Sequence, residues 1–262
     1  MPRTILRNKP LVEAIFELQW ELETRGEGFQ VDPHIKLLIG RMYDRLEDDY
    51  PFHEPLPLAT MPDEIAPHIV RHRFRKGENQ WPLVQLGPGV VTLNDTEGYV
   101  WEEFEQRISR LVDTLFELYP SPDGLSVNLV RLRYIDAIDF DFGKDSVFGF
   151  LGDMLKLHVE LLPSLFEGTG ISDTPLRLDL RFAFASIKPR GAMTLRFARG
   201  ERKGREALLW ETTVVSSGED APKTRNAIAE CASQAHALTH NWFFQLIEGK
   251  LLERFEPCTI DQ

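Results

Sequence analysis

Charged side chains on two alternating segments are the strongest candidates for chemistry in this chain. Residues 11–22 and residues 127–138 both alternate between apolar and polar positions. In a β-strand every second side chain points to the same side of the sheet, so each polar set lies on one face. The two polar faces carry opposite charge, with Glu13 and Glu17 on the first and Arg131 and Arg133 on the second.

Opposed carboxylates and guanidinium groups allow two interpretations. They can form an ion-pair lattice that fixes the junction of two halves of the molecule and has little role in binding. They can also line a polar groove that holds a small ligand or a partner protein. For the groove, the predicted binding residues are Glu13, Glu17, Arg131, Arg133 and Tyr134.

None of these groove residues is predicted to be catalytic, because no base, nucleophile or metal ligand accompanies them at a recognisable spacing. An enzyme with an unfamiliar site in the same groove is kept as an alternative. It would require at least two of the five side chains to converge in a deep pocket with shifted pKa values.

Two further groups contain metal-binding residue types without the rest of a site. His236 and His240 are spaced i, i+4 on a predicted helix, but the Glu of the HExxH pattern and a third ligand are not apparent. Asp136 interrupts the apolar face of its strand, and together with Asp139 and Asp141 it is better explained as a solvated strand exit than as a cation site. The sequence therefore predicts neither a metal nor a cofactor.

A basic cluster in a turn is the candidate for contact with an anion. The turn at residues 200–204 is rich in glycine and charge, which predicts a hairpin. Its candidate anion contacts are Arg199, Arg202, Lys203 and Arg205. No aromatic residue interleaves at the tip, and the net charge of the chain is −11, so nucleic-acid binding is disfavoured. A nucleic-acid-associated protein that uses hairpin 199–205 is the second alternative.

The spacing of apolar residues predicts two halves with the same order of elements. The first half is predicted to contain strands at 11–22, 69–75 and 82–93, a helix that begins near residue 33, and a helix at 100–118. The second is predicted to contain strands at 125–140, 176–187, 192–199 and 207–216, with helices at 146–166 and 221–255. Gly87-Pro88-Gly89 is interpreted as a strand break or bulge, since the proline removes a donor that a phosphate loop would need.

We therefore predict an α+β fold of duplicated strand–helix–strand–strand–helix halves, with a largely antiparallel sheet, helices mainly on one face and a long C-terminal helix. The halves are assigned to 1–120 and 121–262, and the short join at 120–124 favours one compact unit. In the last helix, apolar residues 242–244 cover more than one face, which leaves room for a homodimer contact.

Targeting signals are not found in the chain. The N-terminal residues contain no apolar signal region, and no apolar run approaches the roughly 20 residues that span a bilayer. A cytoplasmic protein with no membrane association is expected.

Three segments resemble a sporadically distributed family of uncharacterised bacterial and archaeal proteins of about this length. They are NKPLVEAIFEL at 8–18, WPLVQLGPGVVTLN at 81–94 and RLRYID at 131–136, the last with Asp136 where the family more often has Asn. The resemblance covers most of the chain and implies no activity, cofactor or site residue. The order of elements is also similar, in topology alone, to the paired modules of GyrI-like ligand-binding proteins.

These observations together predict a non-catalytic binding or regulatory protein. Its partner is expected to be a small ligand or a protein that lies in the charged sheet groove. The sporadic distribution of the resembling family suggests an accessory of a mobile or defence gene cassette.

Overall fold

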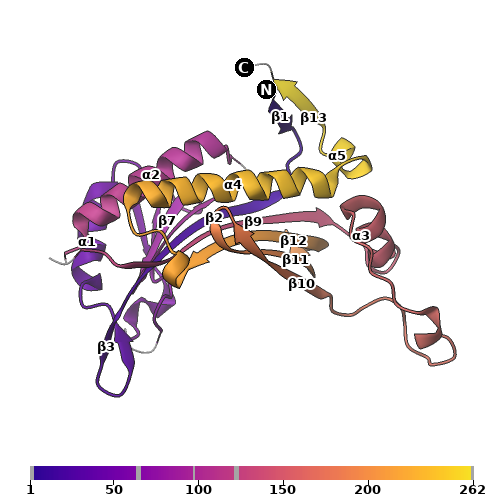
Figure 1. Cartoon of the computed structure of the whole chain (residues 1–262), viewed down its shortest axis with the longest axis horizontal. Coiled ribbons are helices and arrows are strands. Elements are labelled where there is room, and N and C mark those ends of the chain that lie inside the picture. Colours follow the sequence, from indigo (N-terminus) through magenta and orange to yellow (C-terminus); the bar gives the residue numbers. More distant parts are fainter. Residues whose placement is uncertain (1–2, 63–65, 97, 121–123, 261–262) are drawn as a thin grey trace.

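The structure is a computed structural model that describes residues 3–62, 66–96, 98–120 and 124–260. Figure 1 shows a large curved sheet with helices against one of its faces. The described strands of this sheet are β2 (Leu11–Trp20), β5 (Phe52–Pro55), β6 (His72–Arg75), β7 (Leu83–Gly87), β8 (Val90–Asp95), β9 (Val127–Asp139), β10 (Asp179–Ile187), β11 (Arg190–Arg202) and β12 (Arg205–Ser217). The described helices are α1 (Ile35–Leu46), α2 (Trp101–Leu118), α3 (Val147–Leu155), α4 (Arg225–Ile247) and α5 (Lys250–Arg254).

The order of the strands reveals the duplication. The sheet runs β10-β11-β12-β9-β2-β8-β7-β6-β5, and every neighbouring pair is antiparallel. Outward from the central pair, β2-β8-β7-β6 on one side matches β9-β12-β11-β10 on the other. The predicted α+β fold with duplicated halves and a largely antiparallel sheet is therefore confirmed. Of the predicted join at 120–124, residues 121–123 lie outside the described part of the chain.

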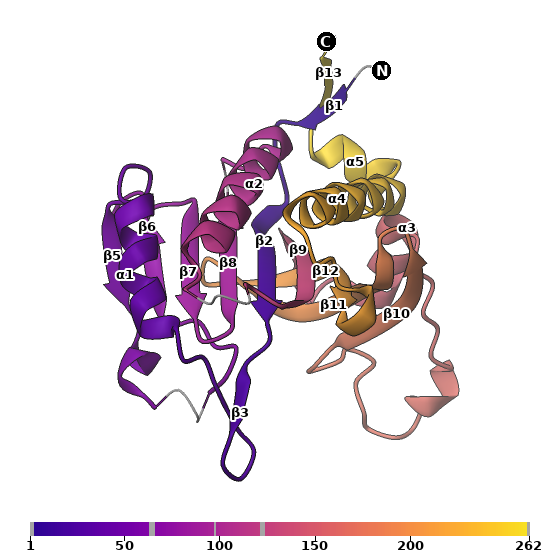
Figure 2. The same cartoon turned by 60° about the vertical axis from the view of Figure 1, so that its left-hand side comes forward.

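The apolar face of the sheet is covered by helices. On β2, the side chains of Ala14, Phe16, Leu18 and Trp20 are fully buried, as the alternation predicts. They pack in one core with apolar residues of α1, α2 and α4, and Figure 2 shows these three helices on the same side of the sheet. The opposite face carries the polar residues of the same strands. The charged residues of these strands and the helix-covered core therefore lie on opposite faces of the sheet.

Two predicted helices are shorter in the structure. The helix predicted at 146–166 begins after Ser146, whose side chain accepts a hydrogen bond from the amide of Gly149, and it ends at Leu155. Lys156 follows in the left-handed conformation with φ of 57°. Leu161, Leu162 and Leu165 are exposed beyond it, so no apolar contact extends the helix. Leu161 continued the apolar pattern that predicted a longer helix, but its side chain has no core to pack against.

The predicted C-terminal helix at 221–255 is interrupted. α4 begins after Thr224, whose hydroxyl caps the amide of Ala227, and it ends at Ile247. Gly249 has φ of 94°, a value that favours glycine, and α5 begins immediately after it. The long helix is confirmed, with a break near its end that the apolar pattern did not reveal.

The segment Gly87-Pro88-Gly89 forms the turn of a hairpin between β7 and β8, in place of the predicted break within one strand. Gly87 pairs with Val90, and Gly89 has φ of 72°. A proline followed by a glycine of positive φ is the usual sequence of a type II turn. The hairpin predicted at residues 200–204 is confirmed, because Arg202 pairs with Arg205 across a turn of Lys203 and Gly204.

Two short ribbons lie outside the large sheet. β1 (Arg3–Leu6) pairs with β13 (Pro257–Ile260), which brings the two ends of the described chain together near α5 (Figure 1). β3 (Glu23–Arg25) pairs with β4 (Phe29–Val31). Such short strands show too few alternations to be predicted. None of the described helices has the length and apolar character that crossing a bilayer requires.

Candidate functional site

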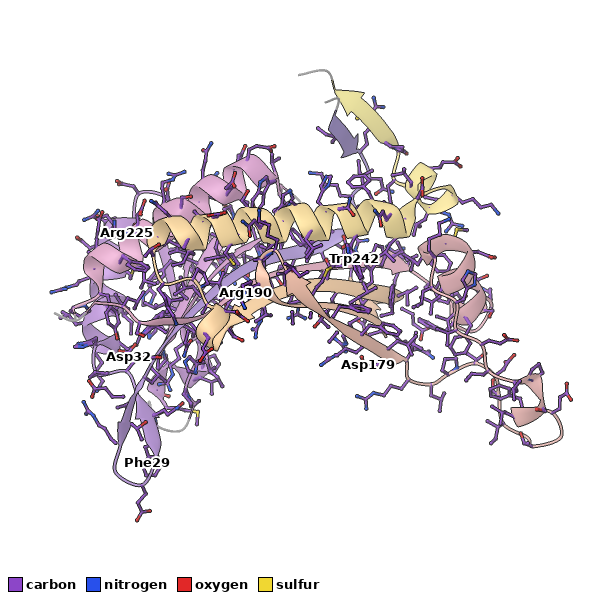
Figure 3. All side chains as sticks on the ribbon, viewed as in Figure 1. Phe29, Asp32, Asp179, Arg190, Arg225 and Trp242 are labelled. Atoms are coloured by element: carbon purple, nitrogen blue, oxygen red, sulfur yellow. The ribbon has the colours of Figure 1, made fainter. Side chains whose placement is uncertain are left out.

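The charged residues predicted from β2 and β9 lie on the face of the sheet away from the helices, where they pair with one another. Glu17 accepts hydrogen bonds from Nη1 of Arg131 through both oxygens, each at 2.9 Å. Arg133 pairs with Glu211 of β12 at 2.7 Å. Glu211 also accepts from Arg196 of β11 at 2.8 Å, and Arg196 pairs with Asp179 of β10. Figure 3 shows Asp179 on the side of the sheet away from α4.

The network continues into the first half of the sheet. Glu13 accepts a hydrogen bond from the amide of Asn94 at 2.9 Å. Asn94 in turn accepts from Thr92 and Gln85, and Gln85 accepts from Arg73 at 2.8 Å. These side chains have the contacts of an ion-pair and hydrogen-bond lattice, the first of the two interpretations. A ligand groove formed by Glu13, Glu17, Arg131 and Arg133 stays a prediction.

Tyr134, the fifth predicted binding residue, lies on the opposite face. It alternates with Arg133 on β9 and points toward the helices, where it is buried. There it lines a cavity of about 290 Å³ between the sheet, α2, α4 and the N-terminal segment. The lining side chains come from residues 5–6, 9–11, 99–102, Tyr134, Asp136, Thr212, His236, Thr239, His240, Phe243 and Phe244. The structure therefore separates Tyr134 from the four charged residues with which it was grouped.

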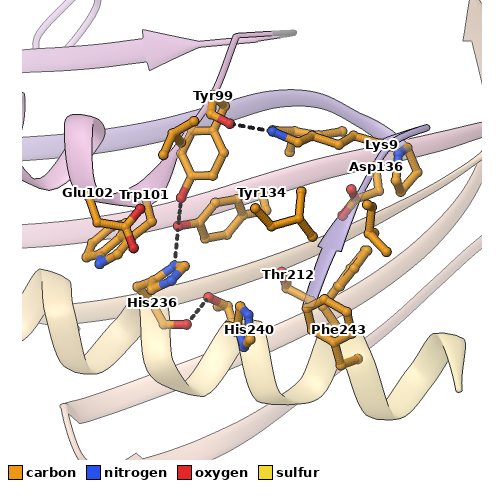
Figure 4. A pocket seen from close by; sticks show the side chains of 17 residues that line it. Lys9, Tyr99, Trp101, Glu102, Tyr134, Asp136, Thr212, His236, His240 and Phe243 are labelled. Carbon is orange, nitrogen blue, oxygen red and sulfur yellow. Dashed lines mark hydrogen bonds between the residues drawn. The ribbon is translucent and has the colours of Figure 1, made fainter. Parts of the chain in front are cut away.

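A chain of hydrogen bonds crosses the cavity wall from Tyr99, just before α2, to His236 on α4. The hydroxyl of Tyr134 lies 2.7 Å from the hydroxyl of Tyr99 and 2.9 Å from Nδ1 of His236. Figure 4 shows the three side chains in one line. Burial, together with the nearby Tyr99, raises the pKa of Tyr134 well above its ordinary value, so this hydroxyl keeps its proton. The imidazole of His236 stacks on Trp101 with ring centroids 3.9 Å apart and planes 6° from parallel.

Each wall of the cavity is placed by a regular element. On α4, His236, His240 and Phe243 are spaced i, i+4 and i+7, which puts them on one helical face. Trp101 is the first residue of α2. The N-terminal segment is held in place because Pro10 accepts a hydrogen bond from the amide of Ala137. The ammonium of Lys9 donates to the carbonyl of Tyr99 at 2.7 Å.

Asp136 is the unusual residue of the cavity. Its side chain is 3% exposed, and its Oδ2 has no hydrogen-bond partner among the described residues. Burial raises the pKa of this carboxyl to about 8, against a smaller opposing effect of the Arg202 guanidinium. Figure 4 shows the carboxyl pointing to the side of the cavity where Tyr134 lies. Buried carboxyls normally have partners, so a donor from outside the chain would fit here.

The arginines of the basic hairpin that were predicted to bind an anion make contacts within the protein. Arg199 pairs with Glu206, and Arg205 pairs with Asp139 at 2.7 Å. Nη1 of Arg202 donates to the carbonyl of Ala137 at 2.9 Å. Anion binding by Arg199, Arg202, Lys203 and Arg205 stays a prediction.

Asp136, His236 and His240 were considered as candidate site residues in the sequence, but each was given a structural interpretation. Asp136 was noticed as a break in an apolar strand face, and the pair His236 and His240 was noticed by its helical spacing. Asp136 was interpreted as part of a solvated strand exit. A carboxyl within the apolar face of a strand is better taken as a sign of a functional residue, because an unpaired charge is rarely tolerated there. Tyr99 gave no signal, and Trp101 was predicted only as part of the apolar face of the helix at 100–118, since the contact between α2 and α4 is not encoded locally.

No protein-family model matches the chain, and no curated protein sequence matches it. The function is therefore inferred from the geometry and chemistry of the cavity.

Proposed function

We propose that the protein is a non-catalytic binding protein and that the cavity on the helix-covered face holds a small ligand. The observation that carries this proposal is the carboxyl of Asp136, which is buried at the cavity wall and lacks a partner for Oδ2 among the described residues. An unpartnered buried polar group costs about 1–3 kcal/mol of stability. A ligand that donates a hydrogen bond to Asp136 would offset this cost.

The size and lining of the cavity define the kind of ligand. A cavity of about 290 Å³ is close to the lower end of the range of about 300–1,000 Å³ that is usual for small-ligand pockets. Tyr99, Trp101 and Phe243 supply aromatic surface, whereas the polar groups lie at a few points. This arrangement is typical of small-ligand pockets and fits a compound with one aromatic ring and one polar head.

The chemistry of the wall supports binding over catalysis. The described residues that line the cavity include no serine or cysteine. The raised pKa of Tyr134 makes it a hydrogen-bond donor and a poor base at neutral pH. Membership of the family that the three sequence segments resemble, and a role in a gene cassette, remain predictions beside this proposal.

The test is a screen of single-ring aromatic fragments against the full chain by thermal shift, followed by crystal structures of the hits. We expect hits that raise the melting temperature and lie beside Tyr134 and Asp136. Glu17→Gln, on the opposite face, is the matched control and should bind the same fragments equally well. Hits that all lie on the open face, or a screen without hits at millimolar concentration, would overturn the proposal.

A further inference from the structure

The ionisable side chains that line the cavity determine which polar group a bound ligand can carry. Besides Tyr99 and Tyr134, its ionisable side chains are the acids Asp136 and Glu102, the base Lys9 and the two histidines. The ammonium of Lys9 already donates to the carbonyl of Tyr99, and Nη1 of Arg202, behind the wall, donates to the carbonyl of Ala137. Both contacts go to backbone carbonyls, and the charge of Arg202 offsets only part of the effect of burial on the pKa of Asp136.

The groups that face Asp136 come from every element around it. Leu11 of β2 and Trp210 of β12 are its partners in the sheet register, and Tyr134 is its neighbour on the same face of β9. Lys9 precedes β2, Arg202 lies on the β11–β12 hairpin, and His236 and His240 project from α4. Leu11, Trp210 and Tyr134 are apolar or aromatic, whereas Lys9 and Arg202 are cations. Burial nevertheless outweighs the charge of Arg202 at the Asp136 carboxyl, so a cation that pairs directly with this carboxylate is favoured there.

We propose that the cavity is selective for small planar cations, of the aromatic amidinium or protonated nitrogen-heterocycle class, whose N–H groups pair with the carboxylate of Asp136. This inference rests on the proposed function and specifies its ligand. The ring of such a ligand lies against Tyr99 and Phe243, whose π faces also attract cations. A planar N–H head matches the geometry of a carboxylate and can donate to both of its oxygens.

Binding of such a cation is coupled to the loss of one proton. At neutral pH the carboxyl of Asp136 carries a proton because burial raises its pKa to about 8. When a cation enters, the O–H bond of Asp136 breaks, the proton leaves to solvent, and an N–H of the ligand donates to the resulting carboxylate. When a neutral weak base enters, the same proton passes to the ligand nitrogen, and no proton is released. In both cases the bound pair has no net charge.

The experiment is isothermal titration calorimetry of the full chain with three compounds that share one ring and one planar head. Benzamidine is a cation, benzamide is neutral, and benzoate is an anion. We expect benzamidine to bind at least about tenfold more tightly than benzamide, and benzoate to bind more weakly than either. Titrations at neutral pH in buffers of different ionisation enthalpy should show release of close to one proton with benzamidine and none with benzamide.

Two variants locate the selectivity. Asp136→Asn should weaken benzamidine binding at least about tenfold while it leaves benzamide binding within about threefold, because the amide keeps hydrogen-bonding capacity without charge. Asp48→Asn, the same chemical change at an exposed position after α1, should leave all three affinities unchanged. Circular dichroism checks the fold of each variant, and if Asp136→Asn does not fold, the selectivity and proton release of the native chain decide the question.

The outcomes separate the two proposals. Benzamide or benzoate binding as tightly as benzamidine in the cavity would overturn the cation selectivity and leave the proposed small-ligand site intact. Benzamidine binding without proton release, or with equal affinity in Asp136→Asn, would also overturn it. Absence of binding by all three compounds and by the wider fragment panel would overturn both proposals.

Discussion

The hydroxyl of Tyr134 lies 2.9 Å from Nδ1 of His236, and this contact links the central strand β9 to the helix α4. The same hydroxyl lies 2.7 Å from that of Tyr99, just before α2. Three segments that are far apart in the sequence are thus held in one geometry around the cavity. Buried polar networks of this kind specify a unique arrangement because each member depends on the others.

Removal of the central hydroxyl should therefore reduce stability. Tyr134→Phe leaves Tyr99 and His236 without this shared partner, and we expect a loss of about 1–3 kcal/mol in the free energy of unfolding, measured by urea denaturation. Tyr43→Phe, which removes an exposed hydroxyl at 3.3 Å from the carbonyl of Pro51, is the control and should change stability by less than about 0.5 kcal/mol. The double variant Tyr99→Phe/Tyr134→Phe should lose less than the sum of the single losses. Strict additivity would contradict a shared network.

The lattice on the open face should stabilise the fold without taking part in ligand binding. Glu211 is 12% exposed and accepts from both Arg133 and Arg196. Glu211→Gln should cost about 1–3 kcal/mol of unfolding free energy, with weak dependence on salt because the pairs are partly buried. Glu23→Gln, which removes an exposed pair with Arg25, should cost less than about 1 kcal/mol. Equal costs for the two variants, or loss of fragment binding in Glu211→Gln, would contradict this role.

Local patterns were sufficient to predict the sheet and its two faces. The alternation in residues 11–22 and 127–138 predicted two long strands, and the structure places them side by side as β2 and β9. The pattern also placed Tyr134 and Asp136 on the apolar face. Alternation is a local property of the chain, so the sequence contains it directly.

The cavity could not be assembled from the same patterns. It needs α4 to lie across β9 in one register, so that His236 meets Tyr134 and Trp101. This register is decided by the packing of helices on the sheet and by the N-terminal segment near Lys9, which are tertiary effects. The binding site was therefore predicted at the charged residues of the two strands, because their alternation is visible in the sequence.

The backbone of Ile69 passes so close to Gly87 in the β7–β8 hairpin that a side chain does not fit there. A Cβ at this position would overlap the carbonyl oxygen of Ile69. Gly87→Ala should therefore destabilise the protein by about 1–3 kcal/mol in urea denaturation. Gly40→Ala is the matched control, because Gly40 lies inside α1 with no atom near the added Cβ, and it should stabilise the protein by up to about 1 kcal/mol. Equal effects at the two positions would contradict the steric explanation.

Asp136 makes the stability of the protein depend on pH. Its pKa is about 8 in the folded chain, against an ordinary value of 3.8. The folded state therefore binds this proton more tightly than the unfolded state does. Between these two values the unfolded chain has lost the proton while the folded chain retains it, so the contribution of Asp136 to stability falls as the pH rises. Below the lower value both states are protonated, and above the higher value both are ionised, so the contribution is constant there.

The variant Asp136→Asn removes this titration. We expect its unfolding free energy, relative to that of the native chain, to increase with pH by up to about 1.4 kcal/mol per pH unit and to level off above about pH 8. Urea denaturation at several values between about pH 5 and 9, without ligand, measures this difference. Asp48→Asn makes the same chemical change at an exposed position after α1 and is measured alongside as the control. A constant difference for Asp136→Asn would show that the carboxyl is already ionised in the folded protein, and the proton release expected on cation binding would then be absent as well.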